Sequence, residues 1–180
     1  MKSINNVVPV TQSSLALSKS HLRAYLLSLL ENLEFVEQSP RYHPEGNALF
    51  HSLQVFQLAH QSSQDPCLWA AALLHDIGKA IDYQYHDEVG AEQLEGLLSP
   101  RIVWLIRHHL DLLKSPKRTR HRLQAWPQLL QELSWLRRWD LQGRQIHIDV
   151  PSHDYAVEQI IQYFAIITEI PKDSIYQKIH

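Results

Sequence analysis

Apolar residues recur along this chain at intervals of three and four, and strand-like alternation of β-branched residues is nearly absent. Such spacing places apolar side chains on one face of an α-helix and therefore predicts helices. One apolar stripe runs from Leu22 to Leu33. A second helix fits residues 48–59, with Leu49 and Phe56 on its inward face.

The segment after Asp65 is the most apolar part of the chain. Asp65 followed by Pro66 is typical of a helix start, with the aspartate as N-cap and proline at the first helical position. The helix continues through Leu74, and we expect it to break near Gly78. Because this helix has almost no polar face, we expect it to be buried on nearly all sides.

The second half of the chain predicts further helices, two of them opened by proline. They cover residues 88–98, 101–113 after Ser99-Pro100, 127–141 with Gly143 as the stop, and a last helix through Ile167 that Ser152 or Asp154 caps. The polar and basic residues 114–122 are expected to form a loop.

Together these elements predict an all-α fold, a single domain of about seven or eight helices. We expect the domain to cover residues 19–169, with its core at residues 40–145. Residues 1–18 are expected to be an irregular extension and residues 170–180 a C-terminal tail. A chain of 180 residues can bury one hydrophobic core without the help of disulfides.

The composition narrows the class of protein. Lys and Arg total 17 and Asp and Glu total 19, and this net charge of −2 argues against a binder of long polyanions. Cys67 is the single cysteine, which excludes an internal disulfide and a cysteine-built zinc site. The longest apolar run, residues 67–74, is too short to span a bilayer, and the N-terminus lacks a signal-peptide core. We therefore expect a cytoplasmic protein that does not bind membranes.

Histidine is abundant, at 12 residues, and the most informative of them is in the pair His75-Asp76 at the end of the apolar helix. Burying an imidazole and a carboxylate is costly unless a partner neutralises them, and a metal ion is one such partner. An exposed helix end would explain the same dipeptide, which recurs as His86-Asp87 and His153-Asp154. The last of these pairs follows Ser152 and is typical of a helix cap.

Other imidazoles and carboxylates lie beside apolar residues on separate predicted helices. They are His51, His86, His108, His109 and Asp140. A lone histidine of this kind is more often a hydrogen-bonded core residue than a ligand. Several histidines together, with two aspartates and no cysteine, favour a metal site built from nitrogen and oxygen ligands.

The order of His51, then His75-Asp76, then Asp140 resembles the HD-domain superfamily of metal-dependent phosphohydrolases. The resemblance covers roughly residues 20–145 and rests on the motifs Leu-Leu-His-Asp-Ile-Gly-Lys at 73–79, His86 with Glu88, Gly90 and Ala91, and Ile-Arg-His-His at 106–109. Arg-Tyr-His-Pro-Glu-Gly at 41–46 and Asp-Leu-Gln-Gly-Arg at 140–144 are similar to the HD domains of bacterial CCA-adding tRNA nucleotidyltransferases. Because the chain has no nucleotidyltransferase portion, we expect a free-standing HD domain.

This resemblance implies a set of metal ligands. The minimal set is His51, His75, Asp76 and Asp140. Matches at His86 and His109 imply the larger set of two-metal members, in which Asp76 would bridge the ions. We assign His109 rather than His108 because the family's Ile-Arg-x-His pattern ends there. One or two divalent ions would bind, and Mn, Fe, Ni, Co, Zn and Mg all stay open.

The implied reaction is hydrolysis of a phosphomonoester or phosphodiester by metal-activated hydroxide, on a small, nucleotide-like substrate. Lys79 and Arg107 are expected to bind the phosphate and to act in catalysis beside Asp76, and Arg144 is expected to bind substrate in the same cleft. Four aromatic residues could stack on a base or could equally serve in packing: Tyr42, Tyr83, Tyr85 and Trp104. The basic segment 114–122 could guide a nucleic acid, but a small phosphorylated substrate is favoured.

Two other functions stay open. A di-iron oxygenase similar to myo-inositol oxygenase would use the same six ligands, because imidazole binds iron, zinc and nickel alike. A metal-stabilised module that binds a nucleotide without turnover is the third reading. The sequence leaves the oligomeric state undecided.

Overall fold

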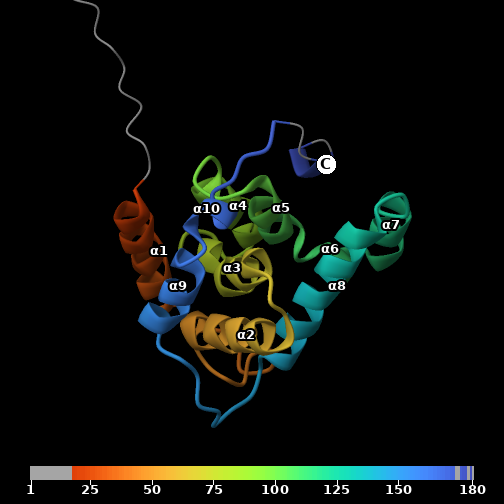
Figure 1. Cartoon of the computed structure of the whole chain (residues 1–180). Helices are drawn as coiled ribbons and strands as arrows, with labels where there is room; N and C mark the ends of the chain where they lie inside the picture. The colour runs from red at the N-terminus through yellow and green to blue at the C-terminus, as the bar shows by residue number, and fades with distance from the viewer. Residues whose placement is uncertain (1–17, 173–174, 178, 180) are drawn as a thin grey trace, which may run out of the picture.

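The computed structural model describes residues 18–172, 175–177 and 179, and within these ranges the chain forms helices and no strand (Figure 1). The α-helices are α1 (Lys19–Leu33), α2 (Ala48–Ser62), α3 (Pro66–Leu74), α4 (His86–Leu94), α5 (Pro100–His108), α6 (Asp111–Lys114), α7 (Pro116–Arg122), α8 (Pro127–Gln142), α9 (His153–Ile161) and α10 (Phe164–Ile167), and the 3-10 helices are η1 (Ile77–Ala80) and η2 (Ile175–Gln177). The predicted all-α fold is confirmed. Eight α-helices of this described part have seven residues or more, as expected, and α6 and α10 are single turns.

Short polar side chains fix several helix starts. Ser18, Asn47, Asp65 and Ser152 each precede a helix and accept a hydrogen bond from a backbone N–H of its first turn. Such caps satisfy donors that have no partner inside the helix. The predicted caps at Asp65 and Ser152 are confirmed, and His153-Asp154 lies at the start of α9 as expected of a capped helix.

Helix α3 lies at the centre of the molecule, with α2, α5, α8, α9 and α10 packed around it (Figure 1). All nine of its residues are buried, as its apolar sequence predicts. The α-helix ends at Leu74, and η1 begins at Ile77, so the break comes slightly before Gly78. His75 and Asp76 therefore occupy the junction between the two helices, in the interior of the fold.

Gly78 allows η1 to lie against the first turn of α4. A Cβ atom on Gly78 would lie 2.2 Å from the carbonyl oxygen of His86 and 2.7 Å from the backbone nitrogen of Gly90. Both neighbours are backbone atoms, which cannot rotate away, so only glycine fits this contact. The contact places the start of α4 beside the end of α3.

The structure corrects several predicted boundaries. Residues 101–113 do not form one helix, because α5 ends at His108 and a separate turn, α6, follows. The basic segment 114–122, predicted as a loop, is mostly helical: Lys114 ends α6 and residues 116–122 form α7, where Thr119 Oγ1 donates to the carbonyl of Ser115. Helix α4 ends at Leu94 rather than 98, shortly before Gly96, whose φ of +73° takes the chain out of the helical conformation.

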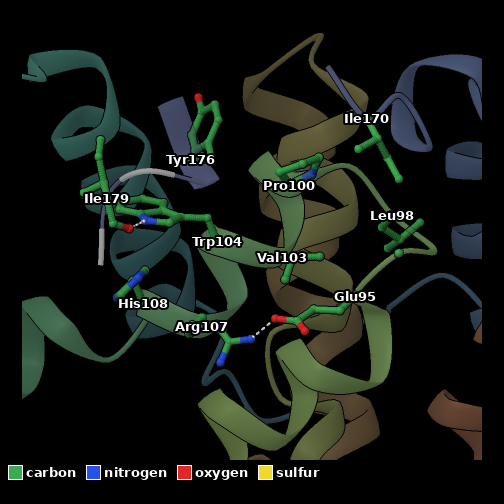
Figure 2. Close-up of a pocket in the computed structure, with 11 residues that line it drawn as sticks. Glu95, Leu98, Pro100, Val103, Trp104, Arg107, His108, Ile170, Tyr176 and Ile179 are labelled. Atoms are coloured by element: carbon green, nitrogen blue, oxygen red, sulfur yellow. Dashed lines mark hydrogen bonds and ion pairs between the residues drawn. The ribbon is translucent and has the colours of Figure 1, made fainter. Parts of the chain in front are cut away.

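The last predicted helix is also divided, into α9 and α10. Further along, η2 packs on α5, and Trp104 Nε1 donates a hydrogen bond to the carbonyl of Ile179 (Figure 2). Residues 1–17 of the predicted N-terminal extension lie outside the described residues. Within the described ranges, no helix is both long enough and apolar enough to cross a membrane.

Candidate metal centre

Four buried histidines share one orientation. The Nδ1–H of each donates to a backbone carbonyl: His51 to Gly143 at 2.8 Å, His75 to Ala72 at 2.9 Å, His86 to Tyr83 at 2.8 Å and His109 to Ile106 at 2.6 Å. His75 and His109 follow the last residues of α3 and α5, and their acceptors are carbonyls of the final turns of those helices. In the neutral ring, a proton held on Nδ1 leaves a lone pair on Nε2, and this is the tautomer that binds metals through Nε2.

The four Nε2 atoms converge on the carboxylate of Asp76. Its Oδ2 lies 3.4 Å from His75 Nε2 and 3.8 Å from His51 Nε2. Its Oδ1 lies 3.3 Å from His86 Nε2 and 3.8 Å from His109 Nε2. Asp76 thus stands between two pairs of imidazoles and turns one oxygen toward each pair.

Asp140 completes the first of these groups, because its Oδ1 lies 3.3 Å from His51 Nε2. We call His51, His75, Asp140 and Asp76 Oδ2 the first half-site, and His86, His109 and Asp76 Oδ1 the second half-site. The ligand atoms of His51, His75 and Asp76 lie within 4.8 Å of one another, and so do those of Asp76, His86 and His109. Two half-sites that share a carboxylate are the arrangement of a dinuclear centre.

Buried ring nitrogens without a hydrogen-bond partner indicate that these residues suit a cation. The Nε2 atoms of His51, His75 and His109 are buried and make no hydrogen bond. A buried polar atom without a partner costs free energy, and a divalent ion would supply the partner for several of these atoms at once. Imidazole and carboxylate donors without thiolate suit Mn, Fe, Co, Ni and Zn.

The protonation states also fit metal binding. Burial lowers the pKa of His75 to about 3 and also lowers the pKa of His109, so both rings are neutral at pH 7. Burial alone would raise the pKa of Asp76, but His75, Lys79 and His86 outweigh it and hold this pKa well below its ordinary value. Burial opposes the protonated form of His51 too, yet Asp140, Glu45 and Asp76 raise its pKa to about 9. A cation at the first half-site would therefore replace a proton on His51.

The centre opens into a cleft of about 430 Å³ with three cations in its wall. Lys79 Nζ donates to Asp76 Oδ2 and to Gln38 Oε1, both at 2.6 Å. Arg144 Nη2 lies 3.0 Å from Asp140 Oδ1, and Arg137 Nη1 lies 2.5 Å from Asp140 Oδ2. The structure thus brings Lys79 and Arg144 to the six expected ligands. Our sequence reasoning missed Arg137, although its position one helical turn before Asp140 was a usable signal.

Arg107 does not lie in this cleft. Its guanidinium pairs with Glu88 and Glu95. It borders a different pocket, which Val103 and Leu98 also line (Figure 2). Because α5 turns Arg107 toward α4, the structure does not bring this predicted substrate-binding residue to the cleft that holds the metal ligands. The neighbouring His108 also points elsewhere, and its Nδ1 lies 2.9 Å from Asp111 Oδ2.

The aromatic candidates divide in the same way. Tyr42 and Tyr83 line the cleft and are exposed, whereas Trp104 is buried in the other pocket. Tyr85 is exposed but is not part of the cleft wall. In the basic segment, Lys114 pairs with Asp87 at 2.7 Å and Arg122 with Asp111 at 2.5 Å, so two of its five cations are neutralised.

Comparison with known proteins agrees with this geometry. A family model described as the HD domain matches residues 49–149, a range that contains all six candidate ligands. A multifunctional CCA protein of Methylococcus capsulatus is 36% identical over 75 residues, which cover 38% of this chain and 18% of the relative. The multifunctional CCA protein of Thioalkalivibrio sulfidiphilus is 43% identical over 56 residues, covering 31% of this chain and 14% of the relative.

A third relative, the multifunctional CCA protein of Acinetobacter baumannii, is 25% identical over 162 residues, covering 63% of this chain and 39% of the relative. The chain thus spans well under half the length of these three curated relatives. The family match covers more than half of the chain, and the helical fold and the His and Asp clusters agree with it. The chain belongs to the HD domain family.

Proposed function

We propose that this protein is a metal-dependent phosphohydrolase that cleaves a phosphomonoester or phosphodiester of a small, nucleotide-like substrate. One observation carries the proposal: two metal half-sites share Asp76 at the base of a cleft whose wall holds Lys79, Arg137 and Arg144. Divalent ions bound there would polarise a phosphoryl oxygen and make a bound water a stronger nucleophile.

The charges of the site favour an anionic substrate. Three buried carboxylates, those of Glu45, Asp76 and Asp140, are matched by the three cations Lys79, Arg137 and Arg144. A divalent ion at the second half-site would therefore add its full charge to the cleft, and one at the first half-site would add its charge less that of the proton it displaces from His51. Two guanidinium groups held by one carboxylate keep further N–H donors free, and these are suited to the oxygens of a phosphate.

The rest of the cleft fits a small molecule with an aromatic part. Its volume of about 430 Å³ lies in the usual range of small-ligand sites. The exposed rings of Tyr42 and Tyr83 and the apolar side chains of Leu110 and Leu113 line it. Aromatic faces of this kind stack on nucleobases. We propose a nucleotide-like substrate ahead of a long nucleic acid, because part of the basic segment is already neutralised.

A di-iron oxygenase is the second candidate. Four imidazoles and two carboxylates arranged around a shared Asp76 would hold two iron ions as well as two hydrolytic ions. The three cations of the cleft favour the hydrolase, since an uncharged substrate would not need them. A non-catalytic, nucleotide-binding role is the third candidate, and an assay must distinguish it from the hydrolase and the oxygenase.

The test is reconstitution of the metal-free protein with Mn, Co, Ni, Mg or Fe, followed by metal analysis and a panel of phosphomonoesters and phosphodiesters. We expect hydrolysis at the same rate with and without air. Product formation that requires iron and consumes oxygen, with no phosphoester cleaved, would establish the oxygenase instead. Metal-loaded protein that binds nucleotides and converts none of the panel would establish the binding module.

A further inference from the structure

Glu45, in the segment between α1 and α2, is a buried carboxylate that meets two imidazoles. Its side chain is 0% exposed, and its Oε1 lies 2.9 Å from His43 Nδ1 and 2.9 Å from His51 Nδ1. Glu45 and His43 precede the residues that match the HD domain. The first of the two contacts is a hydrogen bond, in which His43 donates and the carboxylate accepts.

The second contact, between Glu45 and His51, is made on the side of the His51 ring that faces away from the candidate metal centre. His51 Nδ1 faces both the carbonyl of Gly143 and the carboxylate of Glu45, while its Nε2 faces the first half-site. The other three ligand histidines have only a backbone carbonyl at Nδ1. A carboxylate on the outer nitrogen of a metal-bound imidazole fixes its orientation and makes it a stronger ligand.

A purely structural role does not explain the charge of Glu45. A buried carboxylate is costly unless it is well compensated, and here Oε2 is buried and has no hydrogen-bond partner. A glutamine of the same shape would fill the position at a lower cost of desolvation. The negative charge is therefore best explained by the two imidazoles on Oε1.

His43 holds this carboxylate in place. Its Nδ1–H bonds to Glu45 Oε1, and its ring packs edge-on against His51, with the ring centroids 5.0 Å apart. We propose that Glu45 is a positioning residue for the metal ligand His51, and that His43 positions Glu45 in turn. The proposal rests on the metal binding of the proposed function and is independent of the reaction.

The main variant is Glu45→Gln, studied by calorimetric titration of the metal-free protein with Mn²⁺ or Co²⁺. We expect the affinity of the first half-site to fall by about 10–100-fold, while the second half-site changes by about twofold or less. The matched control is Glu132→Gln, since Glu132 is also buried but pairs with Arg101, away from the metal centre. It should lower the melting temperature and leave both metal affinities unchanged.

A pair of His43 variants tests the second step. His43→Asn can keep an N–H donor near the position of Nδ1 and should retain most of the metal affinity of the first half-site. His43→Gln places its amide one bond further from the backbone, cannot donate to Glu45 in the same way, and should lower that affinity. Because both residues act through one chain of contacts, Glu45→Gln combined with His43→Gln should cost no more than Glu45→Gln alone.

Two results would overturn the proposal. One is a folded Glu45→Gln protein that binds metal at both half-sites with wild-type affinity. The other is an equal loss at both half-sites that follows the fall in melting temperature, as a general loss of stability would give. Since the titration uses metal alone, it decides the proposal even if the protein hydrolyses no phosphoester.

Discussion

Gly78 and His86 are in such close contact that a single methyl group on Gly78 would lie 2.2 Å from the carbonyl oxygen of His86. This contact sets the distance between η1 and α4, and so between Asp76 and the imidazole of His86. The second half-site thus depends on a residue that carries no side chain.

Replacing Gly78 with alanine should separate η1 from α4. We expect a loss of about 1–3 kcal/mol in the free energy of unfolding, typical of overpacking, together with loss of metal from the second half-site. Thermal unfolding and metal titration measure the two effects. Gly96→Asn is the control, because Gly96 has φ +73° and open space around it. Asparagine tolerates this conformation, so metal binding should stay unchanged.

Arg107 and Arg137 should respond differently to removal of charge. Arg137→Met takes donors from the cleft, and we expect KM for a phosphorylated substrate to rise by roughly tenfold, as for the loss of a charge-assisted hydrogen bond. Arg107→Met removes surface ion pairs with Glu88 and Glu95, so it should cost about 1 kcal/mol of stability or less and leave KM unchanged. Steady-state kinetics on both variants tests this, and a large rise in KM for Arg107→Met would return that residue to the substrate site.

Removal of metal should destabilise the fold. Metal-free protein leaves the Nε2 atoms of His51, His75 and His109 buried without hydrogen-bond partners, and an ion that binds only the folded state stabilises it by an amount that grows with the logarithm of the ion concentration relative to Kd. A chelator should therefore lower the melting temperature, and added Mn²⁺ should restore it in a concentration-dependent way. Equal melting temperatures with and without metal would mean that these atoms do not hold an ion.

The sequence predicted most of the fold because the helices carry clear signals. Asp65-Pro66 and Ser152 are local caps, and the apolar residues of α3 leave it no polar face. The exceptions have local causes as well. The predicted helix over residues 101–113 ends early where the imidazole of His109 bonds the carbonyl of Ile106, and a ring that is turned toward a metal site cannot be foreseen from helical periodicity.

The candidate site was predicted in part. The motif match pointed to the six residues that the fold brings together, but it said nothing of the direction in which a side chain leaves its helix. Arg107 is only two residues before His109 in sequence, yet it borders a different pocket from the cleft that His109 lines. Glu45 was missed because it lies in the segment between α1 and α2, where helical periodicity does not predict the direction of a side chain, and its contact with His51 appears only in the fold. Arg137 could have been found, because it precedes Asp140 by one helical turn.

The bridging position of Asp76 is the central claim, and metal analysis combined with an assay of phosphoester hydrolysis tests it most directly. After reconstitution with Mn²⁺, the wild type should hold about two ions per chain and hydrolyse a phosphoester. His86→Ala should keep about one ion, since the first half-site is intact. Asp76→Ala should retain no tightly bound metal and show no turnover, because Asp76 belongs to both half-sites. His75→Ala should lose the ion of the first half-site and its turnover. An Asp76→Ala protein that keeps its metal and its activity would contradict the account.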